Sequence, residues 1–102
     1  MNVLDLAYNN LSGTMSSLVN SLSFSPFEID LSGNKFIGVL PMEIANLKNL
    51  EHLDISENMF GEIPASIGSC VKLEILSMGS NFFQGVIPSS LESLRGDRKS
   101  VV

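Results

Sequence analysis

The side chains of this chain that are best suited to chemistry are acidic, and they recur beside short apolar segments. Most of the eleven acidic residues, and the one histidine, lie within or next to pairs of aliphatic residues such as Leu53-Asp54-Ile55. Successive side chains of a strand point to opposite faces, so the residue between two inward aliphatics faces solvent. We therefore expect one solvent-facing acidic surface, without lysine or arginine, that a basic peptide or a basic protein patch would complement. Its expected members are Asp5, Tyr8, Glu28, Asp30, Glu51, His52, Asp54, Glu57, Glu74 and Ser77.

His52 and Cys70 are the other candidate reactive side chains. A histidine among carboxylates could bind a divalent metal, but one histidine with solvent-facing acids at strand spacing is more typical of a solvated face. We therefore expect no metal and no cofactor. Cys70 takes the register of Leu47 in the preceding segment, which predicts a small buried hydrophobe rather than a nucleophile. The sequence carries no nucleotide-binding, kinase or hydrolase signature, so we predict that the chain is not an enzyme.

The composition limits the classes of partner and the location. The chain has 102 residues, enough for one domain, and its formal net charge of −5 argues against binding to a nucleic acid backbone. No segment approaches the roughly 18 apolar residues of a membrane-spanning helix. The first residues have neither the basic region nor the cleavage site of a signal peptide, so the chain as written would remain in the cytosol.

The elements that must position these side chains form an internal repeat. Four segments share the pattern apolar-x-apolar-x-x-Asn-x-apolar, and their asparagines are spaced by 25, 24 and 23 residues. The pattern predicts a short strand in each segment, followed by a turn at which the asparagine side chain bonds backbone groups. Stacked copies would form a ladder of Asn9, Asn34, Asn58 and Asn81, and Phe36, Phe60 and Phe83 should stack beneath it.

The second half of each unit predicts a bend and then helical turns. Gly-x-apolar-Pro recurs at 38–41, 61–64 and 85–88, where glycine permits the bend and proline ends strand pairing. Apolar residues then recur every three positions, which favours short 3₁₀ turns over a long helix. The first unit reads Gly-Thr-Met-Ser at 13–16, which weakens the case for an outer strand there. The third unit lacks one residue between Phe60 and Gly61, which we interpret as a deletion in a surface turn.

The period and the motif resemble a known family. A unit of about 20–29 residues with L-x-x-L-x-L-x-x-N-x-L is typical of leucine-rich repeats. Residues 1–94 resemble the plant form with the extension G-x-I-P, which occurs in receptor-like Ser/Thr kinases and receptor-like proteins. The resemblance implies an α/β fold, an uncapped right-handed solenoid of about four repeats with a parallel concave sheet and a 3₁₀ or irregular convex side. The expected units are 1–24, 25–49, 50–72 and 73–94, and residues 95–102 are expected to form a basic, disordered, non-repeat tail.

The resemblance also implies a function. Such regions bind proteins or peptides, including co-receptor ectodomains, on the extracellular side of the plasma membrane, and a membrane helix and a kinase domain, absent from this chain, often follow. The incomplete first and last units indicate a truncated fragment of a receptor ectodomain. One alternative is a structural spacer or pseudogene product, in which the strand aspartates are ordinary consensus; another is a small secreted enzyme inhibitor. Asn10-Leu11-Ser12 is a glycosylation sequon that a secreted parent could use.

Overall fold

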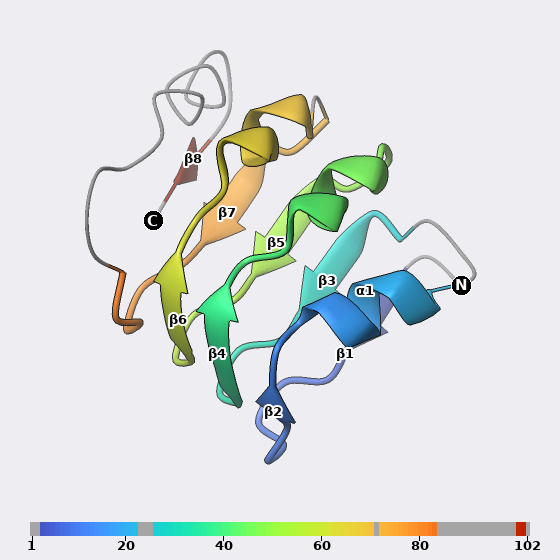
Figure 1. Cartoon of the computed structure of the whole chain (residues 1–102). Helices are drawn as coiled ribbons and strands as arrows, with labels where there is room; N and C mark the ends of the chain where they lie inside the picture. The colour runs from blue at the N-terminus through green and yellow to red at the C-terminus, as the bar shows by residue number, and fades with distance from the viewer. Residues whose placement is uncertain (1–2, 23–25, 71, 84–99, 102) are drawn as a thin grey trace.

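A computed structural model describes residues 3–22, 26–70, 72–83 and 100–101. Figure 1 shows two layers of strands, with helical segments along one side. The five-stranded sheet contains, in spatial order, β1 (Val3–Asp5), β3 (Glu28–Asp30), β5 (His52–Asp54), β7 (Ile75–Ser77) and β8 (Ser100–Val101). The three-stranded sheet contains β2 (Ser12–Gly13), β4 (Lys35–Val39) and β6 (Met59–Glu62). Helix α1 (Ser16–Ser21) and the 3₁₀ helices η1 (Met42–Asn46) and η2 (Ala65–Ser69) follow the strands of the smaller sheet.

Each repeat unit makes one coil of the chain, which passes through both sheets and a helical segment. Neighbouring strands in each sheet are parallel, and apart from β8 they come from successive units. The register places Leu4 beside Ile29, Ile29 beside Leu53 and Leu53 beside Leu76, so aliphatic residues of one repeat position form a row. These observations confirm the predicted α/β repeat fold with a parallel sheet.

The core fills the space between the two sheets and the helical segments. One continuous cluster of buried side chains runs along the stack, from Met15 in the first unit to Leu76 in the fourth. Phe36 and Phe60 stack inside it, with 6.1 Å between ring centroids and 11° between ring planes. Phe83 is partly buried against the same cluster. Because every unit shares its apolar side chains with its neighbours, the units stabilise one another rather than folding separately.

The outer side of the first unit is more regular than the sequence predicted. Strand β2 forms although Gly-x-Ile-Pro is missing, because the second unit holds it. Leu11 donates its N–H to Asn34 Oδ1 (3.1 Å) and its carbonyl accepts from the N–H of Lys35 (2.7 Å). The following segment is the α-helix α1 rather than a 3₁₀ turn, with the N–H of Val19 bonded to the carbonyl of Met15. The proline that precedes η1 and η2 is absent there, and the chain adopts the wider turn.

The interpretation of the missing residue in the third unit was wrong, because it falls inside strand β6 and not in a turn. The register pairs Ile37 with Met59, Gly38 with Phe60 and Val39 with Glu62. Gly61 is therefore a bulge in β6. In the first pair, Ile37 lies three positions after its ladder asparagine and Met59 only one position after its own, an offset of two, and the second pair has the same offset. In the third pair, Val39 and Glu62 each lie two positions before the proline of their unit. The bulge at Gly61 reduces this offset by one position, and the missing residue of the third unit accounts for the other position.

The C-terminal residues differ in part from the expected disordered tail. Ser100 and Val101 form β8, which pairs with Ile75 and Leu76 at the edge of the larger sheet. The edge of a parallel sheet has unpaired N–H and carbonyl groups, and a strand that adds there satisfies them. Residues 95–99 and 102, like the expected Gly-x-apolar-Pro at 85–88, lie outside the described residues. Among the described residues, no helix is both long enough and apolar enough to cross a membrane.

Candidate functional site

The predicted acidic residues lie on the solvent side of the larger sheet and at its two ends, and we call this surface the acidic face. The register places Asp5, Asp30, Asp54 and Ser77 in one row and Glu28 beside His52 in a second row. Glu51 and Glu74 directly precede β5 and β7, whereas Tyr8 and Glu57 lie in the turns that follow β1 and β5. A shallow hollow of about 160 Å³ opens on the face and is lined by side chains of both rows.

The strand aspartates have a structural role that the sequence analysis did not assign. Asp30 Oδ1 accepts hydrogen bonds from the N–H (3.0 Å) and the hydroxyl (2.6 Å) of Ser32. Asp54 Oδ1 makes the same two bonds with Ser56, at 3.0 and 2.6 Å. Each aspartate thereby closes the turn that follows its strand. The recurring Asp-x-Ser pattern in the sequence was the signal for this role. Glu28, Glu51 and Glu74 make no such turn contact.

The asparagine side chains join each unit to the one before it. Asn58 Nδ2 donates to the carbonyl of Leu31 in the preceding unit (2.8 Å) and to Ile55 in its own turn (3.2 Å). Its Oδ1 accepts from the N–H of Phe36 in the preceding unit (3.1 Å). Asn34 and Asn81 make the equivalent bonds. Within the described residues, Asn9 bonds only carbonyls of its own turn, because no earlier unit stands beside it there.

The residue before each ladder asparagine forms a ridge along one end of the acidic face. All four residues of this ridge have left-handed backbone: Tyr8 (φ 54°), Gly33 (φ 68°), Glu57 (φ 55°) and Ser80 (φ 54°). Tyr8 is 71% exposed, and its hydroxyl donates to Glu57 Oε2 at 2.6 Å across the intervening unit. That hydrogen bond is the largest cause that raises the pKa of Tyr8 above its ordinary value of 10.0, followed by the charge of Glu57, desolvation, and the charges of Asp54 and Asp30. The repeat pattern predicted that Tyr8 and Glu57 lie on the surface but not that they are in contact.

The absence of a side chain at Gly33 allows the contact between Tyr8 and Glu57. A Cβ atom at Gly33 would collide with Cδ1 of the Tyr8 ring and come within 2.6 Å of Cε1. The aromatic ring therefore lies directly on the backbone of the second unit on its way to the third. Comparing the residue before the asparagine in all four repeats, Tyr, Gly, Glu and Ser, would have shown a large aromatic residue next to a vacant position.

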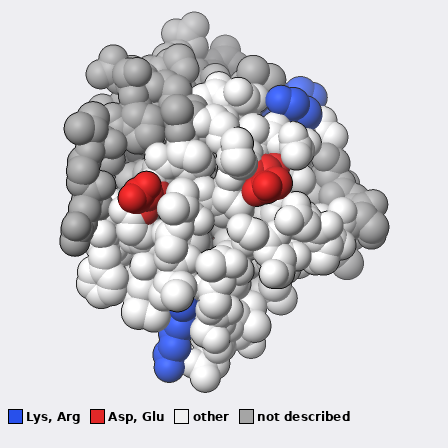
Figure 2. Space-filling view, viewed as in Figure 1, with Lys and Arg blue, Asp and Glu red and all other residues white. Residues whose placement is uncertain are grey.

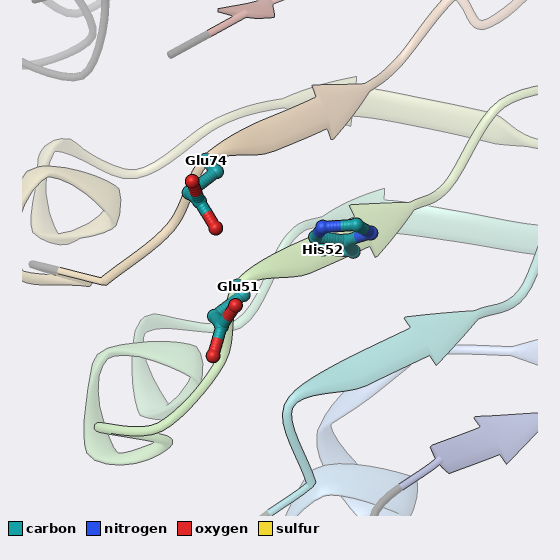
Figure 3. Close-up of side chains that lie close together, drawn as sticks. All are labelled: Glu51, His52 and Glu74. Atoms are coloured by element: carbon teal, nitrogen blue, oxygen red, sulfur yellow. The ribbon is translucent and has the colours of Figure 1, made fainter. Parts of the chain in front are cut away.

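At the opposite end of the face, His52 lies among carboxylates. Its Nδ1 is 3.7 Å from Glu28 Oε1, and one ligand atom each from Glu51, His52 and Glu74 lie within 4.8 Å of one another (Figure 3). The N–H groups of Glu51 and His52 both bond the carbonyl of Phe27, so the regular alternation of strand side chains has not yet begun there. Both side chains therefore lie on the solvent side. One nitrogen and two carboxylate oxygens form a donor set that suits a divalent ion such as zinc, although the sequence analysis expected no metal here.

The remaining candidate residues have simple environments. Cys70 is buried as predicted, its thiol donates to the carbonyl of Ile44 (3.4 Å), and burial raises the pKa of the thiol above 9.0. Asn10, in the sequon, is exposed. Figure 2 looks onto the smaller sheet, where the surface is largely uncharged, with two separate acidic spots near its middle and basic side chains at two of its edges. Exposed Ile37, Val39 and Met59 belong to strands of that sheet.

The sequence matches known proteins over most of its length. Residues 27–47, 49–70 and 72–94 match the Leucine Rich Repeat family. Receptor-like protein 39 of Arabidopsis thaliana is 37% identical over 93 residues, which are 86% of this chain and 10% of that protein. The chain thus spans about a tenth of the length of this curated relative.

Solved structures from the same plant resemble the whole described fold. A chain of the BIR3–SERK2 complex of Arabidopsis thaliana has a TM-score of 0.82 and 36% identity, covering 98% of this chain and 53% of that one. The ectodomain of the membrane receptor kinase GASSHO1/SCHENGEN3, solved in complex with CASPARIAN STRIP INTEGRITY FACTOR 2, has a TM-score of 0.80 and 39% identity over 93% of this chain and 11% of that one. With the family match covering more than half of its residues, the chain belongs to the leucine-rich-repeat family, in the form shared by plant receptor-like proteins and receptor kinases.

Proposed function

We propose that the chain is a non-enzymatic repeat module that binds a basic protein or peptide on its acidic face. The observation that supports this proposal best is the charge of the face. Glu28 lines the shallow hollow, and Glu51 and Glu74 lie close to His52, which lines the hollow too. The two rows of the described strands contain neither lysine nor arginine. A basic ligand would find a field of one sign there, which speeds encounter and favours the complex.

The relatives support the class of partner. The ectodomain of GASSHO1/SCHENGEN3 was solved in complex with CASPARIAN STRIP INTEGRITY FACTOR 2, and the other structure is a complex of BIR3 with SERK2. Both share the fold of this chain at more than 25% identity. The specific part of the proposal for this chain is the basic character of its ligand, which follows from its own carboxylates and not from the relatives.

The experiment compares two double variants that remove the same charge. Glu28→Gln with Glu74→Gln removes two carboxylates of the acidic face, whereas Glu43→Gln with Glu62→Gln removes two from elsewhere on the chain. The probe is a peptide of alternating lysine and glycine, titrated calorimetrically. Each exposed ion pair is worth about 0.2–1 kcal/mol, so we expect the first variant to bind about twofold to thirtyfold more weakly. The control should bind like the parent, and all differences should shrink at high salt.

Equal weakening in both double variants would show that only net charge matters and would contradict a site on the acidic face. Glutamine keeps the shape of glutamate, and none of the four side chains closes a turn as Asp30 and Asp54 do. Aspartate variants are avoided because the loss of the bonds to Ser32 or Ser56 would disturb the strand ends as well as the charge.

A structural spacer is the second candidate, and the aspartate turns favour it. Asp30 and Asp54 are explained by their bonds to serine, without any ligand. A spacer would bind neither the basic peptide nor a partner ectodomain, and the acidic double variant would then differ from the parent only in net charge. The peptide titration therefore separates the two candidates directly.

We also place the module on the extracellular side of the plasma membrane, as part of a receptor-type ectodomain. The relatives support this location, and Asn10 is exposed in the structure, where a glycan has room. Expression through the secretory pathway should add a glycan to the parent chain and not to Asn10→Gln. A parent chain that carries no mass beyond that of its polypeptide would count against an accessible sequon.

A further inference from the structure

We propose that Tyr8, Gly33 and Glu57 form an anchor for one arginine side chain of a bound protein or peptide, an inference that rests on the proposed function. The three residues occupy the same repeat position in three successive units, and they lie where the ridge meets the acidic face. They supply an aromatic ring, a gap that seats the ring and a carboxylate at the hydroxyl end of the ring.

The backbone holds these groups in place before any ligand arrives. The N–H of Tyr8 donates to the carbonyl of Ser32 (2.8 Å), and the N–H of Glu57 donates to the carbonyl of Gly79 (2.9 Å). The N–H of Gly33 donates in the same way to the carbonyl of Ser56 (3.1 Å), so all three anchor residues are hydrogen-bonded to the next unit along the stack. The hydroxyl of Tyr8 then fixes the carboxylate of Glu57 at 2.6 Å. A site that is already ordered loses less entropy on binding, which favours affinity.

The ring presents one free face. One side lies on Gly33, where a Cβ atom would not fit, and 71% of the tyrosine remains exposed. A cation above an exposed tyrosine ring is attracted by the ring quadrupole. Glu57 accepts the tyrosine hydroxyl through Oε2, so Oε1 of the same carboxylate can accept a hydrogen bond from that cation.

This combination selects arginine over lysine. A planar guanidinium can stack flat on the ring while its N–H groups reach a carboxylate at the edge of the ring, whereas a compact ammonium ion cannot do both as well. Asp30 and Asp54 are close enough for their charges to act on the tyrosine hydroxyl, and they add attraction for a cation. The corresponding residue of the fourth unit, Ser80, has no ring, so the anchor is confined to the first three units.

The test compares two peptides of equal charge, one alternating arginine with glycine and the other lysine with glycine. The parent chain should bind the arginine peptide about twofold to fivefold more tightly, as expected for a cation–π contact at an exposed site. Tyr8→Ala and Glu57→Gln should each abolish that preference. The matched control is Phe82→Ala, which removes an aromatic side chain that is 64% exposed and lies outside the anchor.

A second measurement observes the anchor directly. The chain has one tyrosine and no tryptophan, so its phenolate absorbance reports Tyr8 alone. A guanidinium bound over the ring should lower the pKa of Tyr8, and the lysine peptide should lower it less. An arginine-to-lysine preference that survives Tyr8→Ala would overturn the anchor. Equal binding of both peptides, weakened by the loss of Glu28 and Glu74, would overturn the anchor while leaving the proposed function intact. Binding of neither peptide would overturn both.

Discussion

Replacement of Asn58 by alanine should cost far more stability than the same replacement of Asn9. Asn58 is 4% exposed, and its Oδ1 accepts the hydrogen bond of the Phe36 N–H inside the core region. Leaving a buried donor without its partner costs about 1–3 kcal/mol, and the lost donor bonds of Nδ2 add about 1 kcal/mol. The carbonyl groups that Asn58 contacts are not left without a hydrogen bond. The carbonyl of Leu31 still accepts from Asn34 Nδ2, and the carbonyl of Ile55 still accepts from Asn81 Nδ2. We expect a total of about 2–4 kcal/mol.

Asn9 makes a suitable control because it holds the same repeat position without the inter-unit acceptor role. Its side chain is exposed and donates to the carbonyls of Leu6 and Ala7, and the carbonyl of Leu6 also accepts a hydrogen bond from Asn34 Nδ2. Asn9→Ala should therefore cost less than about 1 kcal/mol. Urea denaturation followed by circular dichroism gives both free energies of unfolding. For a chain of 102 residues, whose total stability is about 5–15 kcal/mol, the difference is easily measured. Equal costs at the two positions would refute the view that the ladder joins the units.

Three further predictions concern single residues. Gly33→Ala should cost about 1–2 kcal/mol from the left-handed backbone, and it should move the raised pKa of Tyr8 back toward 10.0, as read from phenolate absorbance. Burial raises the pKa of the Cys70 thiol, so stability should be full below pH 9.0 and fall as the pH rises above it, and Cys70→Ala should reduce that fall in denaturation curves. Phe60→Ala, at a fully buried site, should cost about 3–5 kcal/mol, whereas Phe82→Ala should change the melting temperature little.

The repeat period predicted most of the fold because each unit repeats one solution to the same packing problem. An aliphatic residue at every second position beside a fixed asparagine is sufficient to place Leu53 in the core and Asp54, which is half-buried, on the solvent side of the sheet. Stacking then follows, since no single unit can bury its apolar side chains alone. What the pattern could not predict depends on contacts between units. Strand β2 exists because Asn34 of the next unit holds Leu11, which the sequence of the first unit does not reveal.

The candidate site was predictable in its charge but not in its contacts. Alternation in strands is enough to place Glu28 and His52 on the solvent side, and their 3.7 Å approach follows from the parallel register. The contact between Tyr8 and Glu57 joins residues 49 positions apart, and it depends on the absence of a side chain at Gly33. The repeat period gives the number of residues in each unit. It does not show at which positions a small residue in the next unit leaves room for a large side chain.

The ridge shows how one structural requirement can create positions for recognition. Each ladder asparagine turns back to bond the carbonyl three residues earlier, as Asn34 does with Leu31, and the residue before it adopts left-handed backbone. That conformation strains most L-residues, yet Tyr8 and Glu57 both adopt it, because the ladder and the N–H bonds to the next unit fix the chain on both sides. The backbone conformation of the ridge is therefore the same in all four units, while the exposed side chains of Tyr8 and Glu57 lie outside the core. A ligand that contacts this ridge therefore meets exposed side chains, such as that of Tyr8, whose backbone position is fixed by the fold.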